Sequence, residues 1–407
     1  MFPLEYRSFA FAMLVISLFL PDAANAEQFE KPPEFNASAV VSADQIPAGV
    51  TIASPVISDG LLRIYTVDTP YGQFVFDGDG YAKQRLKELM AVERLSQAEL
   101  NDEFKSSFEK SLREPVEFVQ GAVQNPTGAV KKTISGVSRL FDRAAAGIRN
   151  AGEGPDNIAA SLLGVSKAKR EIAVSLGVDP YSDFGPLKER LERAAQASAA
   201  GGLTVKGLFM LIPGGAGVAV SSVSTASDIA TLIRDKTASE LMEINRSRLR
   251  RAAGNVPSIN LFLENPHYTL GDQAVVAAAL LKLREVKNVN AMLSRMASVI
   301  QKSQAIFLRE RVRLTAEYSA SDSEIAAFFD AGGLPLSRTV DGEIVTILPL
   351  DALAWTERSA GIFERVQTGL AGDGNASEKR LIITGEATPL AQERLGAAGW
   401  KVERKPN

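Results

Sequence analysis

The feature that most constrains the fold is a run of helical periodicity that extends from about Tyr81 to Ala331. Breaks rich in glycine and proline divide it into segments of ordinary helix length. Helices are predicted at residues 81–96, 98–122, 127–149, 156–176, 187–212, 215–235, 237–252, 257–264, 271–285, 287–317 (as one helix or two) and 322–331. The last of these is expected to begin at a capping box formed by Ser321 and Glu324. The pattern predicts a multi-helix bundle.

Strand-like sequence precedes the helical run. Residues 27–60 are rich in proline, alanine, serine and valine and are expected to be extended. Leu62–Asp68 and Tyr71–Phe76 are rich in β-branched and aromatic residues, and Thr69-Pro70 separates them. These two segments predict an N-terminal β-hairpin.

The C-terminal residues combine strands with helices. Leu336–Val340 and Glu343–Leu348 flank Asp341-Gly342, which predicts a hairpin with a type I′ turn and positive φ at both turn residues. The remaining predicted elements are a helix over 350–368, a strand at Arg380–Thr384, a helix from Thr388-Pro389 to Gly399, and a strand at Trp400–Arg404. This order gives a ββαβαβ module, and one hypothesis is that the two β segments pair into a single sheet.

The predicted fold class is therefore mainly α, a multi-helix bundle with an N-terminal β-hairpin and a small C-terminal α/β (ββαβαβ) module. The corresponding domains are a signal peptide at 1–26, an extended segment and β-hairpin at 27–80, a helical domain at 81–333, and the C-terminal module at 334–407.

The N-terminus has the features of a secretory signal peptide. Arg7 precedes an uncharged apolar run at Phe9–Leu20, and Ala24-Asn25-Ala26 supplies the small residues of a cleavage site. As a helix, this run of twelve residues rises only about 18 Å, less than the hydrocarbon core of a bilayer. We expect cleavage after Ala26 and a periplasmic or secreted location, with peripheral association with the inner membrane as a further hypothesis.

The composition excludes several classes of chemistry. The chain has no cysteine, which removes disulfides, thiol nucleophiles and cysteine-ligated metals. It has one histidine, His267, and no G-x-S-x-G elbow, so neither an ordinary zinc site nor a serine–histidine site is expected. A net charge of −3 together with export argues against nucleic acid as a partner. No catalytic, metal-binding or cofactor-binding residue and no cofactor is predicted.

An apolar stretch at residues 194–233 allows two interpretations. It carries only two charges, Lys206 and Asp228, and Pro213-Gly214-Gly215 lies near its centre. As two helices it could insert into a membrane, but a central lysine costs about 3 kcal/mol there and the apolar residues of the first arm contribute a similar amount. We therefore expect a helical hairpin buried in the bundle and keep membrane insertion or pore formation as an alternative.

Two basic segments are candidate contacts for a membrane or another anion. The first is a predicted basic amphipathic helix, in which apolar residues lie on one face and the segment also carries several basic residues. In the second, arginines gather at the end of a helix, where they also oppose the helix dipole favourably. The candidate residues are Lys131, Lys132, Arg139 and Arg143 in the first segment, and Arg246, Arg248, Arg250 and Arg251 in the second.

These features together predict an exported bacterial envelope protein with a non-catalytic interaction or structural role, associated with a membrane surface. The expected partners are anionic lipid or another envelope protein. The alternative enzyme hypothesis is a carboxylate-dependent hydrolase of envelope polysaccharide, which requires two acids that converge in a cleft.

Overall fold

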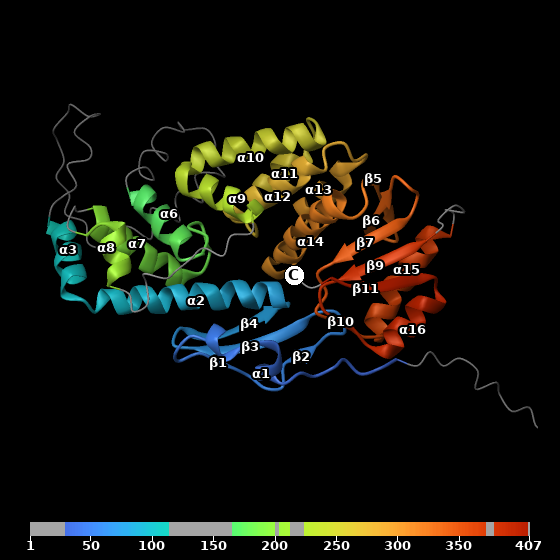
Figure 1. The fold of residues 1–407 in the computed structure, drawn as a ribbon, viewed down its shortest axis with the longest axis horizontal. Helices are drawn as coiled ribbons and strands as arrows, with labels where there is room; N and C mark the ends of the chain where they lie inside the picture. The colour runs from blue at the N-terminus through green and yellow to red at the C-terminus, as the bar shows by residue number, and fades with distance from the viewer. Residues whose placement is uncertain (1–28, 114–164, 200–202, 212–223, 372–377, 406–407) are drawn as a thin grey trace, which may run out of the picture.

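The computed structural model describes residues 29–113, 165–199, 203–211, 224–371 and 378–405. Within these residues helices predominate, and the strands form three sheets, the largest of which combines parallel and antiparallel pairs. In Figure 1 the N-terminal sheet lies along the lower edge, most helices lie at the left and the top, and the largest sheet lies at the right. The mainly helical fold class is confirmed, whereas the predicted signal peptide lies outside the described residues.

The described helices differ widely in length. They are α1 (Ala37–Val40), α2 (Asp79–Glu99), α3 (Asp102–Arg113), α6 (Val165–Ser175), α7 (Gly185–Ala199), α8 (Val205–Met210), α9 (Ser224–Asp235), α10 (Ala238–Ala253), α11 (Ser258–Leu263), α12 (Leu270–Lys282), α13 (Val289–Ala297), α14 (Lys302–Ser321), α15 (Glu357–Leu370) and α16 (Pro389–Ala397), with a 3-10 turn at Ala43–Gln45. The strands are β1 (Thr51–Ile52), β2 (Ile57–Ser58), β3 (Arg63–Thr69), β4 (Gly72–Asp77), β5 (Ile325–Ala331), β6 (Leu334–Thr339), β7 (Ile344–Leu348), β8 (Ala352–Leu353), β9 (Lys379–Ile383), β10 (Glu386–Ala387) and β11 (Trp400–Arg404).

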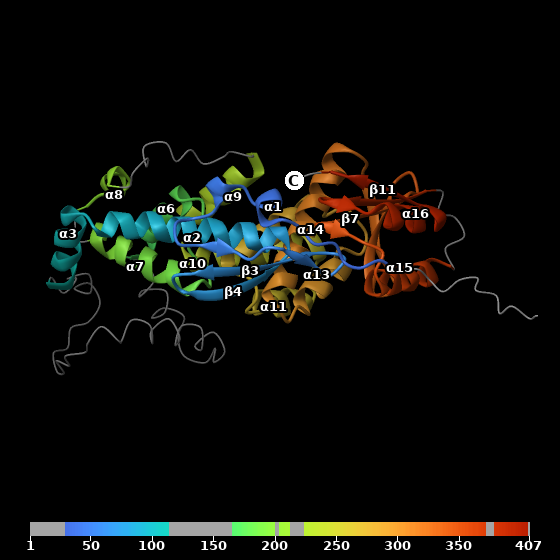
Figure 2. The same cartoon turned by 90° about the horizontal axis from the view of Figure 1, so that it is seen from below.

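β3 is the central strand of the N-terminal sheet. It pairs antiparallel with β4 on one side and with β1 and β2 on the other. Because side chains alternate between the two faces of a strand, Tyr65, Val67 and Phe76 share the buried face, where they join one core with α2. Viewed from below, the sheet lies against α2 (Figure 2).

α2 connects this sheet to the helices. Its buried residues include Leu86, Leu89, Val92 and Leu95, whose spacing of three residues places them on adjoining faces of the helix. α7 and α14 both contact α2. A single long helix therefore packs against the N-terminal sheet and two helices that lie far apart in the sequence.

The five-stranded sheet has the order β11-β9-β7-β6-β5. β5, β6 and β7 are antiparallel, whereas β7, β9 and β11 are parallel and are connected through α15 and α16. α15 and α16 pack on one face with Leu336, Leu348 and Leu381, and helices α12 to α14 pack on the other face with Phe328 and Ile347.

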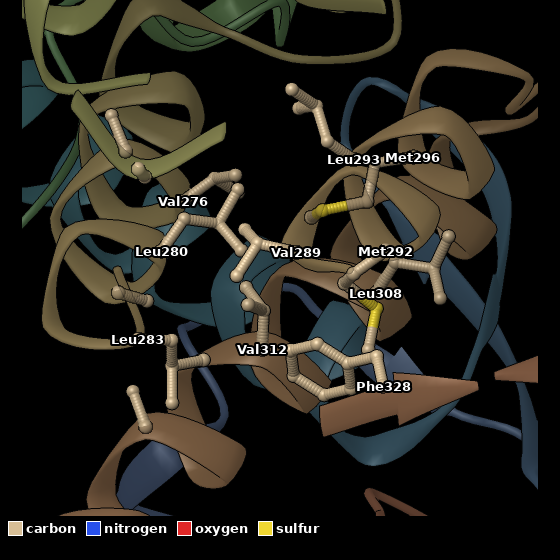
Figure 3. Close-up of a cluster of buried hydrophobic side chains, with 14 of the residues drawn as sticks. Val276, Leu280, Leu283, Val289, Met292, Leu293, Met296, Leu308, Val312 and Phe328 are labelled. Carbon is tan, nitrogen blue, oxygen red and sulfur yellow. The ribbon is translucent and has the colours of Figure 1, made fainter. Parts of the chain in front are cut away.

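The core between these helices and the sheet is densely apolar. Figure 3 shows side chains from α12, α13, α14 and β5 that meet there. The labelled residues are Val276, Leu280, Leu283, Val289, Met292, Leu293, Met296, Leu308, Val312 and Phe328. This core joins the helical part of the chain to the C-terminal sheet.

The helix predicted at residues 322–331 is wrong, because Ile325–Ala331 forms strand β5. Ser321 does not cap a new helix; it is the last residue of α14, and its hydroxyl donates to the Glu317 carbonyl. Gly332 and Gly333 have φ of 62° and 83° and form a turn that leads directly into β6. This turn aligns β5 with β6, and the sheet overrides the local helical pattern.

The turn between β6 and β7 also differs from the prediction. Gly342 has φ of 88°, but Asp341 does not have positive φ, so the turn is not type I′. The Gly342 N–H donates to the Thr339 carbonyl, as in a longer loop built on a type I turn with glycine at the left-handed position. The hypothesis of a single sheet is wrong as well, since the N-terminal and C-terminal strands form separate sheets.

The apolar stretch at 194–233 lies only partly within the described residues. The helix predicted over 187–212 is not continuous: α7 ends at Ala199, and α8 begins after Thr204, whose side chain accepts the Gly207 N–H. Among the residues that the structure describes, no helix is both long enough and apolar enough to cross a membrane.

Candidate functional site

Helix α10 carries the second group of basic residues predicted from the sequence. Thr237 and Glu240 form a capping box at its start, and Gly254, with φ of 77°, ends it. Leu241, Asn245 and Leu249 are buried at a spacing of four residues, which fixes one side of the helix against α12. Ala252 is buried on the same side, and most of the other residues of α10 are partly or fully exposed.

The four arginines surround the C-terminal half of α10 and do not share one face. Since successive residues are rotated by about 100°, Arg246 and Arg250 lie on one flank of the buried stripe, and Arg248 and Arg251 lie on the other. Arg246 donates through Nη1 to Asn260 Oδ1 on α11 at 2.5 Å. The structure therefore divides the predicted cluster into two pairs.

We call Arg248 and Arg251 the arginine pair. Burial and, to a smaller extent, the positive charge of Arg251 lower the pKa of Arg248. Arg248 Nη1 is buried and has no hydrogen-bond partner among the described residues. Arg63, Arg193, Arg311 and Arg394 also have a buried Nε without a partner. The guanidinium groups of Arg63 and Arg193 pair with Asp79 and Glu99, and Arg311 donates through Nη2 to the Pro335 carbonyl.

Among the residues that the structure describes, no carboxylate forms an ion pair with any of the four α10 arginines. Buried polar groups are nearly always hydrogen-bonded, so an unsatisfied guanidinium nitrogen next to a second arginine requires an explanation. Phosphate and carboxylate groups suit such a pair, because guanidinium binds them with strong, charge-assisted hydrogen bonds. Arg251 is exposed and Arg248 is partly exposed, so the solvent-facing atoms of the arginine pair suit a phosphate or carboxylate group.

The first basic segment cannot be compared in this way. Lys131, Lys132, Arg139 and Arg143 all lie outside the described residues.

Asp183 and Asp272 belong to an ion-pair network. Asp183 pairs with Arg85 at 2.6 Å. Asp272, at the start of α12, pairs with Lys302 at 2.9 Å and with Arg309. These cations hold the pKa of Asp272 well below its usual value despite burial. The network joins α2, α12 and α14.

Asp179 lies beneath the start of α12, where its Oδ2 accepts a hydrogen bond from the Thr269 hydroxyl. Burial and then the negative charge of Asp272 raise the pKa of Asp179 to about 6. Gly271 provides the necessary space, because a Cβ there would lie 2.4 Å from Asp179 Oδ2. Both aspartates are thus fixed within the protein by their partners.

A second buried carboxylate, Asp351, was not predicted as a functional residue. It follows β7 and reaches the N-terminal sheet, where its Oδ2 accepts the backbone N–H groups of Arg63 and Asp79, both at 3.0 Å. Asp79 is the first residue of α2, whose N-cap is Gly78 and has no side chain to cap the helix. Asp351 therefore caps α2 from the other end of the chain.

The surroundings of Asp351 explain its titration. Burial and then the charge of Asp79 raise the pKa of Asp351 to about 7, against the effect of the two N–H donors. Asp79 itself accepts from Arg63 Nη1 and the buried Tyr65 hydroxyl, both at 2.6 Å. A cavity of about 20 Å³ beside Asp351 has room for about one water molecule. We interpret this group as a structural junction.

Metal binding has no support within the described ranges, which contain no group of three or more acidic or histidine residues that could hold an ion. No protein-family model matches the chain, and comparisons with curated proteins and with solved structures give no match either. The site must therefore be interpreted from its own chemistry.

Proposed function

We propose that this chain is an exported bacterial envelope protein with a non-catalytic role, and that it contacts an anionic membrane surface through the arginine pair of α10. The observation that carries the proposal is that Arg248, which is partly exposed, and Arg251, which is exposed, lie on one flank of α10 with no carboxylate partner among the described residues. The acidic residues of the described network are engaged as caps and ion-pair partners, which does not favour a hydrolase.

The magnitude of the expected contact is modest. A basic side chain near an anionic leaflet contributes about 1 kcal/mol, so the arginine pair contributes about 2 kcal/mol. Replacing both arginines should reduce membrane partitioning by about thirtyfold. The interaction should weaken as salt is added, because the contact lies at the surface.

The test is fractionation of a Gram-negative host that expresses the full chain, combined with flotation of the purified protein on liposomes. Wild-type protein should be exported, should float with anionic vesicles, and should be released by salt. Arg248→Gln with Arg251→Gln should remain in the soluble fraction, whereas the control Arg246→Gln should still float. Equal flotation of both variants, or retention of the protein in the cytoplasm, would contradict the proposal.

We also propose that the N-terminal β-hairpin and the C-terminal α/β module, in which β5 precedes the predicted ββαβαβ order, are two β units that bracket the helices. The antiparallel register of β3 with β4 and the parallel registers of β7, β9 and β11 support this organisation.

A further inference from the structure

A groove between α6, α8 and α9 is a cavity of the described residues that no role has yet explained. Its volume is about 530 Å³, within the range of about 300–1,000 Å³ that is typical of small-molecule sites. α8 supplies an apolar wall, and charged side chains from all three helices line the rest. The groove is named the α8 groove below.

The apolar wall consists of Val205, Phe209 and Met210. Val205 and Phe209 are four residues apart on one side of α8 and are half-buried, whereas Leu208 is fully buried in the core. Met210 is 81% exposed, which is unusual for a large apolar side chain next to a cavity. Methionine adapts its shape easily, and this wall is suited to a flexible hydrocarbon chain.

The charged residues of the groove are Lys206, Arg234 and Glu171. Lys206 is exposed and forms no ion pair with any described residue. Arg234 forms an ion pair with the neighbouring Asp235, with Nε 2.7 Å from Oδ1. Glu171 Oε1 lies 3.9 Å from Lys167 Nζ. Glu171 and Arg234 line the same groove from α6 and α9.

We propose that the α8 groove binds a single-chain phospholipid whose headgroup carries both a phosphate and an amine. The acyl chain lies against Val205, Phe209 and Met210. Lys206 and Arg234 bind the phosphate, and Glu171 accepts the ammonium group. Two cations beside one carboxylate match this headgroup better than they match a plain fatty acid, which offers nothing to Glu171. The inference goes beyond the arginine pair and does not depend on it.

The test uses the full mature protein and lysophosphatidylethanolamine with a fluorophore at the end of its acyl chain, below its micellar concentration. Saturable binding is expected, and each of Lys206→Glu and Arg234→Gln should weaken it by about tenfold, as for the loss of a charge-assisted hydrogen bond. Met210→Asp should also weaken binding, because it places a charge beside the acyl chain. The control Lys287→Glu, which replaces an exposed lysine outside the groove, should bind normally.

The headgroup assignment has its own test. Glu171→Gln should weaken binding of the amine-bearing lipid and should leave binding of lysophosphatidate, which lacks the amine, unchanged or tighter. Circular dichroism of every variant should match the wild type. Absence of saturable binding overturns the proposal. So does equal affinity for an uncharged alkyl maltoside, or binding that Lys206→Glu and Arg234→Gln leave intact.

Discussion

The junction at Asp351 allows one prediction to be worked out in detail, because a single oxygen performs both of its structural roles. Oδ2 accepts the N–H groups of Arg63 and Asp79, and thereby connects β3 and the start of α2 to the loop after β7. An asparagine side chain has one carbonyl oxygen in the same place. Asp351→Asn can therefore keep both hydrogen bonds, whereas Asp351→Ala loses both.

The two substitutions should differ in stability. A buried N–H group that loses its acceptor costs about 1–3 kcal/mol, so Asp351→Ala, which strands two, should lower the free energy of unfolding by about 3 kcal/mol or more. Asp351→Asn should be much closer to the wild type. At alkaline pH the Asp351→Asn variant should be more stable than the wild type, because it removes a carboxylate that burial destabilises in its charged form.

The sign of the pH dependence follows from the direction of the shift. Asp351 has a pKa of about 7 in the folded protein and 3.8 without its surroundings, so between these values the folded state binds more protons than the unfolded chain. This contribution to stability is present in acid and is lost as the pH rises from about 4 to about 7. Three pH units correspond to an upper bound of about 4 kcal/mol.

The measurement is urea unfolding of wild type, Asp351→Asn and Asp351→Ala at several pH values from 4.5 to 8. The difference between Asp351→Asn and wild type cancels the other titrating groups and should shift by about 2–4 kcal/mol in favour of asparagine as the pH rises. Asp330→Asn is the control, because exposed Asp330 also accepts one backbone N–H. A pH-independent difference, or an alanine variant as stable as asparagine, would refute the reasoning.

Three further substitutions test other parts of the fold through the midpoint of urea or thermal unfolding. Gly332→Ala should destabilise by at least about 3 kcal/mol, because φ is 62° and its Cβ would lie 2.2 Å from the Arg365 carbonyl oxygen; unchanged stability would contradict the β5–β6 turn. Phe328→Ala, in the core of Figure 3, should cost about 3–5 kcal/mol, and a surface-like loss below about 1 kcal/mol would place Phe328 outside that core. Thr237→Ala should cost about 1 kcal/mol through loss of the α10 cap, without affecting flotation on anionic vesicles.

Sequence periodicity predicted helices where local signals and burial agree. α10 was expected at 237–252 and spans Ala238–Ala253, because a capping box begins it, a glycine ends it, and a four-residue apolar spacing fixes its buried side. The prediction for residues 322–331 was wrong because the seven residues of β5 also fit a helical pattern. Its strand conformation depends on pairing with β6, which a local pattern cannot reveal.

The candidate site shows the same limit. The arginines of α10 were visible as a cluster, but their division into two pairs depends on which side of the helix is buried. Asp351 gave no local signal, since the groups that it binds lie 288 and 272 residues away. One clue was present: Gly78 precedes a helix without a capping side chain, which requires an acceptor from elsewhere.

Buried charged groups of the described residues can be divided into those that have a partner from another element and those with an atom that has none. Asp351 and Asp272 are buried and Arg309 is largely buried. Each is bonded to a partner from another element, and these bonds join the N-terminal sheet, α2, α12 and α14. Arg248 differs, because its buried Nη1 has no described acceptor and the charge that acts on its guanidinium group is that of a second cation, Arg251. Removing a partner from a buried charge costs several kcal/mol, so the unpartnered Arg248 Nη1 is unfavourable, as are the unpartnered Nε atoms of Arg311 and Arg394. Arg251 is exposed beside Arg248, and for this reason we propose that an outside anion contacts the arginine pair and not the larger buried network.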